Sequence, residues 1–288
     1  MPTVPPAGAP SGGGESHQAR EIAESFGSDP GRYDRARPRY PGALIDRIVA
    51  GLRGPGQARG DRPPRNQQSP DLLDVGCGTG IVARQFQAAG CRVLGVDPDP
   101  RMAGLARQNG LEVDVAAFEA WDPAGRTFDA VVSGQAWHWV DPVAGAAKAA
   151  LALRPGGRLA VFWNAFQPPS HLGEAFAAIY RQVMPDAPNL WAGPIVDAYL
   201  MMCGKAGDGI RQAGAFAGVE QWRFDWDRPY TRDEWLDQVP TFGGHSQLPP
   251  AKLQELLTAL GGAVDAAGGS FTMRYATVAV TAERTDAA

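Results

Sequence analysis

The sequence predicts an α/β fold, built on a doubly wound, mostly parallel sheet of seven strands with a helical lid. Three observations lead to this prediction. Short apolar runs alternate with helix-compatible segments from residue 71 onward, the runs are apolar on consecutive positions, and the series loosens into helical patterns at about 165–215. Such an alternation is typical of parallel strands that helices bury on both faces.

The expected elements follow in order along the chain. A helical pattern at 44–49 comes first, carried by Leu44, Ile45, Ile48 and Val49. Five strands are then expected at 71–76, 92–97, 111–116, 128–133 and 158–163, with helices at 81–89, 100–109 and 143–153. Stripes with helical spacing predict two later helices, at 172–183 and 253–260. Apolar runs at 220–226 and 271–283 complete the seven strands.

Two stretches lack the apolar residues that a core requires. Residues 1–20 are rich in Pro, Gly and Ser, and we expect a disordered tail. The stretch 53–70 has a similar composition with added arginines, and we interpret it as a flexible surface insertion, since a long loop costs little closure entropy. Residues 21–288 are expected to form one domain, with the lid at about 165–215.

The composition argues against several classes of protein. No apolar stretch reaches the length of about 18 residues that a membrane span needs, and the first residues do not read as a signal peptide, so we expect a cytoplasmic protein. The spacing of three cysteines and four histidines predicts no metal site. A net charge of −4 disfavours nucleic-acid binding despite the arginines at 31–65. The oligomeric state stays open.

The stretch 74–80, Asp-Val-Gly-Cys-Gly-Thr-Gly, carries the most information about function. A buried strand leads into a glycine turn that opens a helix, where glycine lets a ligand approach the backbone closely. Asp97 ends the second strand, nineteen residues after Gly78. A carboxylate there is placed to accept hydrogen bonds from both ribose hydroxyls, although capping of the next helix is an alternative. Asp74 is placed to hold a cationic amine, and Ile81 occupies the position of a dinucleotide site's third glycine.

Five blocks in this order resemble the class I S-adenosylmethionine-dependent methyltransferases. They are DVGCGTG at 74–80, VDPDPRM at 96–102, VAAFEAW at 115–121, FDAVVSGQAWHWVD at 128–141 and LRPGGRLAVFW at 153–163. The resemblance runs from about Phe26 to Arg284 and implies a Rossmann-like sheet with S-adenosyl-L-methionine as cofactor. It also implies a set of cofactor-binding residues: Asp74, Gly76, Cys77, Gly78, Thr79, Gly80, Asp97, Pro98, Met102, Ala117, Phe118, Gln135 and Trp137.

An upstream segment, residues 33–41, resembles the Y…RPxYP arm of the small-molecule branch of this family. In such relatives a tyrosine and an arginine close over the cofactor, and the matching residues here are Tyr33 and Arg37. A guanidinium suits that task because it pairs with a carboxylate through two hydrogen bonds. The alternative is an ordinary loop that leads into a helix at Pro41.

Methyl transfer is an in-line displacement in which alignment supplies much of the catalysis, so a base is needed only where the nucleophile must lose a proton. His138, in the run Gln135-Ala136-Trp137-His138-Trp139, is the candidate catalytic residue and a possible base; the alternative is a structural histidine between two packed tryptophans. The Asn/Asp-Pro-Pro-aromatic motif of methyltransferases that act on nucleobase or protein amide nitrogens is absent after this strand, where the chain reads Ser133-Gly134-Gln135-Ala136.

The sequence therefore predicts a methyltransferase that acts on a small-molecule acceptor, and it favours oxygen over nitrogen or carbon as the methylated atom. Two alternatives stay open: a regulatory or scaffold protein that binds the cofactor without turnover, and, more remotely, a nicotinamide-dependent oxidoreductase. In the lid, Trp191, Tyr199, Met201, Met202 and Phe216 either line an acceptor pocket or pack the lid. His171 and His245 are expected at the surface, with His245 able to reach the cleft.

Overall fold

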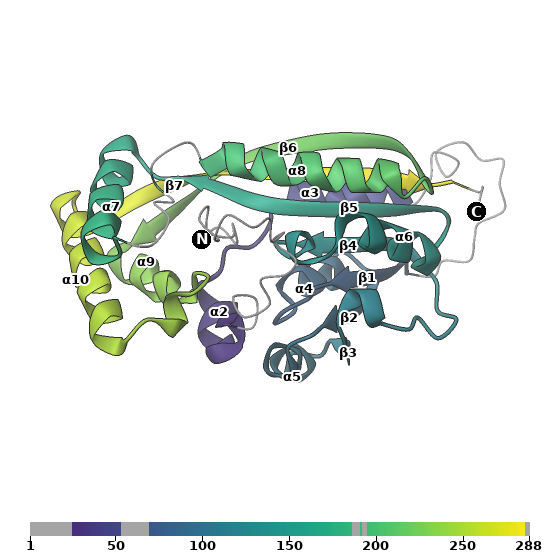
Figure 1. Cartoon of the computed structure of the whole chain (residues 1–288), viewed down its shortest axis with the longest axis horizontal. Coiled ribbons are helices and arrows are strands. Elements are labelled where there is room, and N and C mark those ends of the chain that lie inside the picture. The colour runs from purple at the N-terminus through teal and green to yellow at the C-terminus, as the bar shows by residue number, and fades with distance from the viewer. Residues whose placement is uncertain (1–24, 53–68, 186–190, 192–194, 286–288) are drawn as a thin grey trace. The chain divides into compact units, whose positions relative to one another are not determined.

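The computed structural model describes residues 25–52, 69–185, 191 and 195–285 (Figure 1). The predicted tail at 1–20 and most of the predicted insertion at 53–70 lie outside the described residues. The chain divides into two compact units. The first, which we call the aromatic unit, comprises Met1–Pro38, Asn164–Met201 and Asp225–Thr277; the second, the sheet unit, comprises Arg39–Trp163, Met202–Phe224 and Val278–Ala288.

The strands form a seven-stranded sheet in the order β3-β2-β1-β4-β5-β7-β6, which confirms the predicted α/β fold. Their bounds are Asp71–Val75 for β1, Arg92–Asp97 for β2, Glu112–Val115 for β3, Phe128–Gly134 for β4, Leu153–Gln167 for β5, Phe216–Thr231 for β6 and Ser270–Arg284 for β7. β1 pairs in parallel with β2 and β4, β2 with β3, and β4 with β5. Leu72, Leu73 and Val75 of β1 are at most 1% exposed, as the apolar run predicts for a doubly covered strand.

The helices of the sheet unit are α3 (Gly42–Leu52), α4 (Ile81–Ala88), α5 (Pro100–Gln108) and α6 (Pro142–Ala152), with short 3-10 turns at Phe118–Ala120 and Trp137–Trp139. The four apolar residues that predicted the first of these helices are its buried face. α5 and α6 begin at proline and are capped by the aspartate before it, Asp99 and Asp141 respectively. None of the described helices combines the length and apolarity needed to span a membrane.

The start of β5 differs from the prediction. The strand was expected at 158–163 but begins at Leu153, directly after α6. Its pairing with β4 shifts between Phe128 and Ala130, so that residues 154–157, Arg-Pro-Gly-Gly, bulge out of register. Gly156 has a φ of +73°, which explains why a glycine pair stands in this irregular part of the strand.

The aromatic unit contains α2 (Pro30–Ala36), α7 (Ser170–Val183), α9 (Arg232–Gln238) and α10 (Pro250–Ala266). α8 (Ile195–Gln212) contributes residues to both units. The core of the aromatic unit is a cluster of large rings, among them Phe176 and Trp235, whose rings stack with centroids 5.5 Å apart. His245 belongs to this interior: it is 2% exposed, which corrects the prediction of a surface position, whereas His171 is exposed as expected.

Candidate functional site

The glycine loop connects β1 to α4. Gly76, Gly78 and Gly80 have φ values of +67°, +55° and +84°, in the left-handed region that favours glycine. The backbone N–H groups of Gly76 and Cys77 both donate to the carbonyl of Val96 on β2. A Cβ atom at position 76 would lie 2.3 Å from the Cβ of Ala136, whereas one at position 78 would meet only the Cε of Met102, at 3.5 Å. A side chain at position 76 would therefore collide with Ala136, whereas there is space for added atoms beside Gly78.

Asp97 lies at the carboxyl end of β2 and binds this loop directly. Its Oδ2 accepts the N–H of Gly78 at 2.8 Å, and its Oδ1 accepts the N–H of Asp99 at 2.9 Å. Burial raises the pKa of Asp97 from 3.8 to about 6, although both backbone donors oppose this shift. A carboxylate accepts about four hydrogen bonds, so each oxygen retains capacity for one more. The cap of α5 is Asp99, which accepts from the N–H of Arg101, and the capping alternative for Asp97 is therefore not what the structure contains.

Asp74 is the second acid at the loop and is completely buried. Neither of its oxygens accepts a hydrogen bond of ordinary geometry from the described residues. Burial raises the pKa of Asp74 well above its usual range and the charge of Asp97 adds to this effect, while the backbone N–H of Ala83 opposes it. A buried carboxyl group without strong acceptor bonds is costly, and a bound cation would relieve that cost.

Four more predicted residues flank the loop. Cys77 and Thr79 are buried, and burial raises the pKa of the Cys77 thiol well above its usual value. The Cys77 sulfur fits because its neighbour on β2 is Gly95, where a Cβ atom would lie 2.6 Å from that sulfur. Met102 is 4% exposed and faces the open side of Gly78, and Pro98 is exposed. The structure thus brings the motif at 74–80 together with the end of β2, as the spacing predicted.

Two of the predicted cofactor-binding residues, Ala117 and Phe118, lie after β3. Ala117 is half-buried, whereas Phe118 is 4% exposed and packs against Trp121 and Trp137 with centroid distances of 6.2 and 6.1 Å. Trp137 is 2% exposed, and its indole N–H finds no acceptor among the described residues. The two rings therefore form one apolar wall whose only polar group is a buried donor.

Gln135 adopts an unusual backbone conformation at the end of β4. Its φ of +57° lies in the left-handed region, which costs a residue with a side chain about 1 kcal/mol or more. Its N–H donates to the carbonyl of Phe162 on β5 at 2.9 Å, which holds the turn in place. A conformation of this kind turns the chain sharply at the carboxyl end of the strand, where ligands of open α/β sheets bind.

His138 lies on the 3-10 turn that follows, and its Nδ1 accepts a hydrogen bond. The indole N–H of Trp163 donates to its Nδ1 at 3.2 Å, and the ring lies 4.7 Å from that of Trp139. Because Nδ1 accepts, the neutral ring carries its proton on Nε2. The side chain is 8% exposed. This arrangement occupies the lone pair of Nδ1 and fixes the orientation of the imidazole ring.

Tyr33 and Arg37 belong to the aromatic unit, at α2. Arg37 is 6% exposed, lies 4.8 Å from the ring centroid of Tyr33 and 5.6 Å from that of Phe242, and donates to the carbonyl of Thr241. The closure of this arm over a cofactor stays a prediction.

The sequence-based interpretation missed Ser133 and Gly134 on β4: the Ser133 hydroxyl donates to the carbonyl of Val75 at 2.8 Å, and a Cβ at position 134 would lie 2.6 Å from Val82. A glycine inside an apolar strand was the available signal.

The predicted lid residues do not share one environment. Trp191 and Tyr199 are buried, Met202 and Phe216 are half-buried, and Met201 is 68% exposed.

His245, which was considered for the cleft, is held by the hydroxyl group of Tyr180 at 3.0 Å, and burial lowers its pKa to about 4. Within the described part of the chain no cluster of His, Cys, Asp and Glu is arranged to hold a metal ion.

Comparison with known proteins gives a consistent result. The model of a family described as methyltransferase domain matches residues 33–265. An uncharacterized methyltransferase of Mycobacterium tuberculosis is 37% identical over 148 residues, which are 50% of this chain and 54% of that protein. A ubiquinone biosynthesis O-methyltransferase of Methylocella silvestris is 36% identical over 121 residues, 40% of this chain and 47% of that protein. The chain thus spans about half the length of the curated relatives it matches.

The fold has counterparts among solved structures as well. A putative type II methyltransferase from Anaeromyxobacter dehalogenans superposes with a TM-score of 0.58 at 21% sequence identity, covering 86% of this chain and 97% of that chain.

Proposed function

Because the chain belongs to the family of class I S-adenosylmethionine-dependent methyltransferases, we propose that it transfers a methyl group from S-adenosylmethionine to a small-molecule acceptor, at oxygen rather than at nitrogen or carbon. The observation that supports this most directly is the bond from Gly78 to Asp97. It puts a carboxylate with spare acceptor capacity next to the open side of a glycine loop.

The residues at this loop fit the proposed cofactor. Asp97 would accept both ribose hydroxyls, the task that the equivalent acid performs in nucleotide-binding sheets. Asp74, buried and lacking hydrogen bonds of ordinary geometry, would face the ammonium group of the methionine part. Ala117, Phe118 and Trp137 would flank the adenine ring. Arg37, with Tyr33 against its guanidinium, would pair with the carboxylate.

S-adenosylmethionine supplies, when bound, an electrophilic methyl group on a sulfonium centre. The contribution of this chain is then to hold the acceptor in line and to exclude water. Gln135 and Trp137 at the end of β4 would shape that space. His138, held by Trp163, would position this turn, and an acceptor that ionises readily would need no protein base.

Two observations favour oxygen as the methylated atom. The turn after β4 reads Ser-Gly-Gln-Ala at 133–136, which lacks the motif of enzymes that methylate nucleobase and protein amide nitrogens. One of the relatives is named as an O-methyltransferase.

We also propose a cytoplasmic location, because the three cysteines are buried and form no disulfide, as is usual in a reducing compartment.

A binding experiment followed by a turnover experiment tests the proposal. S-adenosylmethionine and S-adenosylhomocysteine, each at about a hundred times its dissociation constant, should add about 2.7 kcal/mol of stability and raise the unfolding midpoint by about 2–4 °C. NAD should give no shift; a shift with NAD alone would point to an oxidoreductase. Radiolabelled methyl transfer to a panel of phenols, carboxylic acids and amines then follows. Cofactor binding without turnover on any acceptor would favour a regulatory or scaffold protein.

A further inference from the structure

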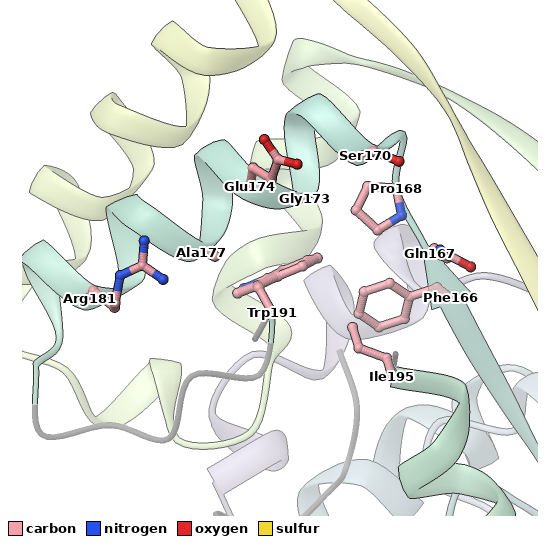
Figure 2. Close-up of a pocket in the computed structure, with 10 residues that line it drawn as sticks. All are labelled: Phe166, Gln167, Pro168, Ser170, Gly173, Glu174, Ala177, Arg181, Trp191 and Ile195. Carbon is pink, nitrogen blue, oxygen red and sulfur yellow. The ribbon is translucent and has the colours of Figure 1, made fainter. Parts of the chain in front are cut away.

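A cavity of about 410 Å³ lies within the aromatic unit, beside α7 (Figure 2). Its volume falls within the range of about 300–1,000 Å³ that small-molecule sites occupy. The glycine loop and the acids Asp74 and Asp97 do not line it, and the function proposed above makes no use of it.

The cavity exists because α7 presents small residues along the side that faces it. Gly173 and Ala177 are four residues apart and therefore lie on the same side of the helix. A Cβ atom at position 173 would meet only the Cγ of Pro168, at 3.6 Å, so there is room for atoms beside this glycine.

Two aromatic rings form the opposite wall. Phe166 and Trp191 are 5% and 8% exposed, and their centroids are 5.6 Å apart at an angle of 59°. Trp191 also packs against Phe176 at 5.3 Å and Tyr180 at 5.9 Å, so its indole belongs to the aromatic core. A wall held in this way is preformed, and a flat apolar ligand would bind without reorganising it.

The rim carries two charged side chains from α7, Glu174 and Arg181. Neither takes part in an ion pair within the described part of the chain. Figure 2 shows the carboxylate of Glu174 turned away from the two rings, whereas the guanidinium of Arg181 extends toward the indole of Trp191. A planar guanidinium beside an aromatic wall suits a ligand that joins an aromatic body to a carboxylate.

We propose that this cavity is a binding site for an aromatic carboxylate, with the ring system between Gly173 and Trp191 and the carboxylate on Arg181. The site goes beyond the function proposed above, because binding here requires neither cofactor nor methyl transfer.

The test uses three naphthalene probes of similar shape and different charge: 2-naphthoate, 2-naphthalenemethanol and 2-naphthylmethylamine. Isothermal titration calorimetry on the full chain, without cofactor, measures each affinity. We expect 2-naphthoate to bind about threefold or more tightly than the alcohol, which is the gain that an exposed ion pair provides. The Arg181→Gln variant should abolish that preference and retain binding of the alcohol.

A second variant tests the location of the site. Gly173→Leu should fill the cavity and weaken 2-naphthoate binding by about tenfold or more. It should also fold, because leucine has a higher helix propensity than glycine and the space is open. The matched control is Gly262→Leu on α10, an exposed helical glycine where an added Cβ atom would meet nothing within 4 Å, and this change should leave the affinity unaltered.

Three results would overturn the proposal: no binding of 2-naphthoate, equal or tighter binding of the amine, or unchanged affinity in a folded Gly173→Leu variant. The readout contains no cofactor, so a failure here leaves the methyltransferase proposal intact, and a failure of that proposal leaves this one intact.

Discussion

The backbone N–H of Gly78 donates to Oδ2 of Asp97 across 2.8 Å, joining the glycine loop after β1 to the carboxyl end of β2. The two residues are nineteen positions apart. Through this bond the residue proposed to bind ribose also fixes the conformation of the loop that would face the ligand. Changes at Asp97 should therefore affect both the contacts with the ligand and the shape of its site.

Substitution of Asp97 by alanine should weaken binding of S-adenosylmethionine strongly. The variant removes two charge-assisted hydrogen bonds to ribose, each worth about 1.5–3 kcal/mol. Calorimetric titration measures the affinity, and circular dichroism checks that the variant is folded. The control is Asp71→Ala at the amino end of β1, which loses ion pairs to Arg92 and Arg154 but should keep the affinity. Unchanged affinity in a folded Asp97→Ala variant would contradict the ribose assignment.

The affinity for S-adenosylmethionine should rise with pH until Asp97 is ionised. Ribose hydroxyls donate to the carboxylate form, and the pKa of Asp97 without ligand is about 6. Binding at about pH 5.5 should therefore release protons, and binding at about pH 7.5 should not, which titrations in buffers of different ionisation enthalpy measure. Proton release that persists in Asp97→Asn would belong to Asp74, whose pKa is also raised.

The raised pKa of Asp97 also affects the stability of the ligand-free protein. This stability should fall as pH rises, whereas the affinity for S-adenosylmethionine should rise. Asp97 has a pKa of 3.8 in the unfolded chain and about 6 in the folded one. The folded state therefore holds this proton more tightly, and its stabilising contribution is complete below about pH 4 and is lost as pH rises through about 6. Urea unfolding of the Asp97→Asn variant should show a weaker decline over this interval than the parent protein.

The strands of the sheet unit could be predicted because burial on both faces makes consecutive positions apolar. β2 begins and ends at the predicted residues. β5 could not be predicted in full, since its first part is Arg-Pro-Gly-Gly, a sequence that indicates a turn, and only pairing with β4 shows that it is a bulge.

α8 and α9 are two of the helices that were not predicted as separate elements, and the reasons differ. In α8 the large buried residues Tyr199 and Ile210 are separated by small buried ones, Cys203, Ala206 and Gly207, so the helical stripe has little hydrophobic contrast. In α9 the sequence does carry a signal: Thr231 and Glu234 form a capping box, which the spacing of these residues indicates directly.

The candidate site also contains one contact that could be predicted from the sequence and one that could not. The pairing of Gly78 with Asp97 was predictable because a strand, a loop, a helix and a second strand have a nearly fixed length in this fold. The partner of His138 was not, since Trp163 lies on β5 and only the parallel pairing of β4 and β5 brings the two side chains together.

The bond from Trp163 to His138 predicts that this histidine acts by position. His138→Asn keeps an acceptor near Nδ1 and should retain stability and turnover within a few-fold. His138→Ala leaves the buried indole N–H of Trp163 without its acceptor, which should cost about 1–3 kcal/mol in urea unfolding. A large loss of turnover in a stable His138→Asn variant, with the alkaline plateau of the pH–rate profile removed, would instead identify a base.

Three glycines with positive φ form a series that separates backbone strain from contacts with the ligand. Gly90, Gly78 and Gly76 have φ values of +89°, +55° and +67°. An alanine Cβ would meet no atom within 4 Å at position 90, only Met102 at 3.5 Å at position 78, and Ala136 at 2.3 Å at position 76. Gly90→Ala should therefore report the cost of the left-handed conformation alone, about 1 kcal/mol in urea unfolding.

Gly78→Ala should lose a similar amount of stability but bind S-adenosylmethionine about tenfold or more weakly, because the added methyl group occupies the open side of the loop. Gly76→Ala should lose a further 1–3 kcal/mol or so, since Ala136 must move to admit the new atom. Gly90→Ala should bind normally. If the alanines at 78 and 90 gave equal affinities, the ligand would not lie against the second glycine, and the cofactor would have to be placed elsewhere on the sheet edge.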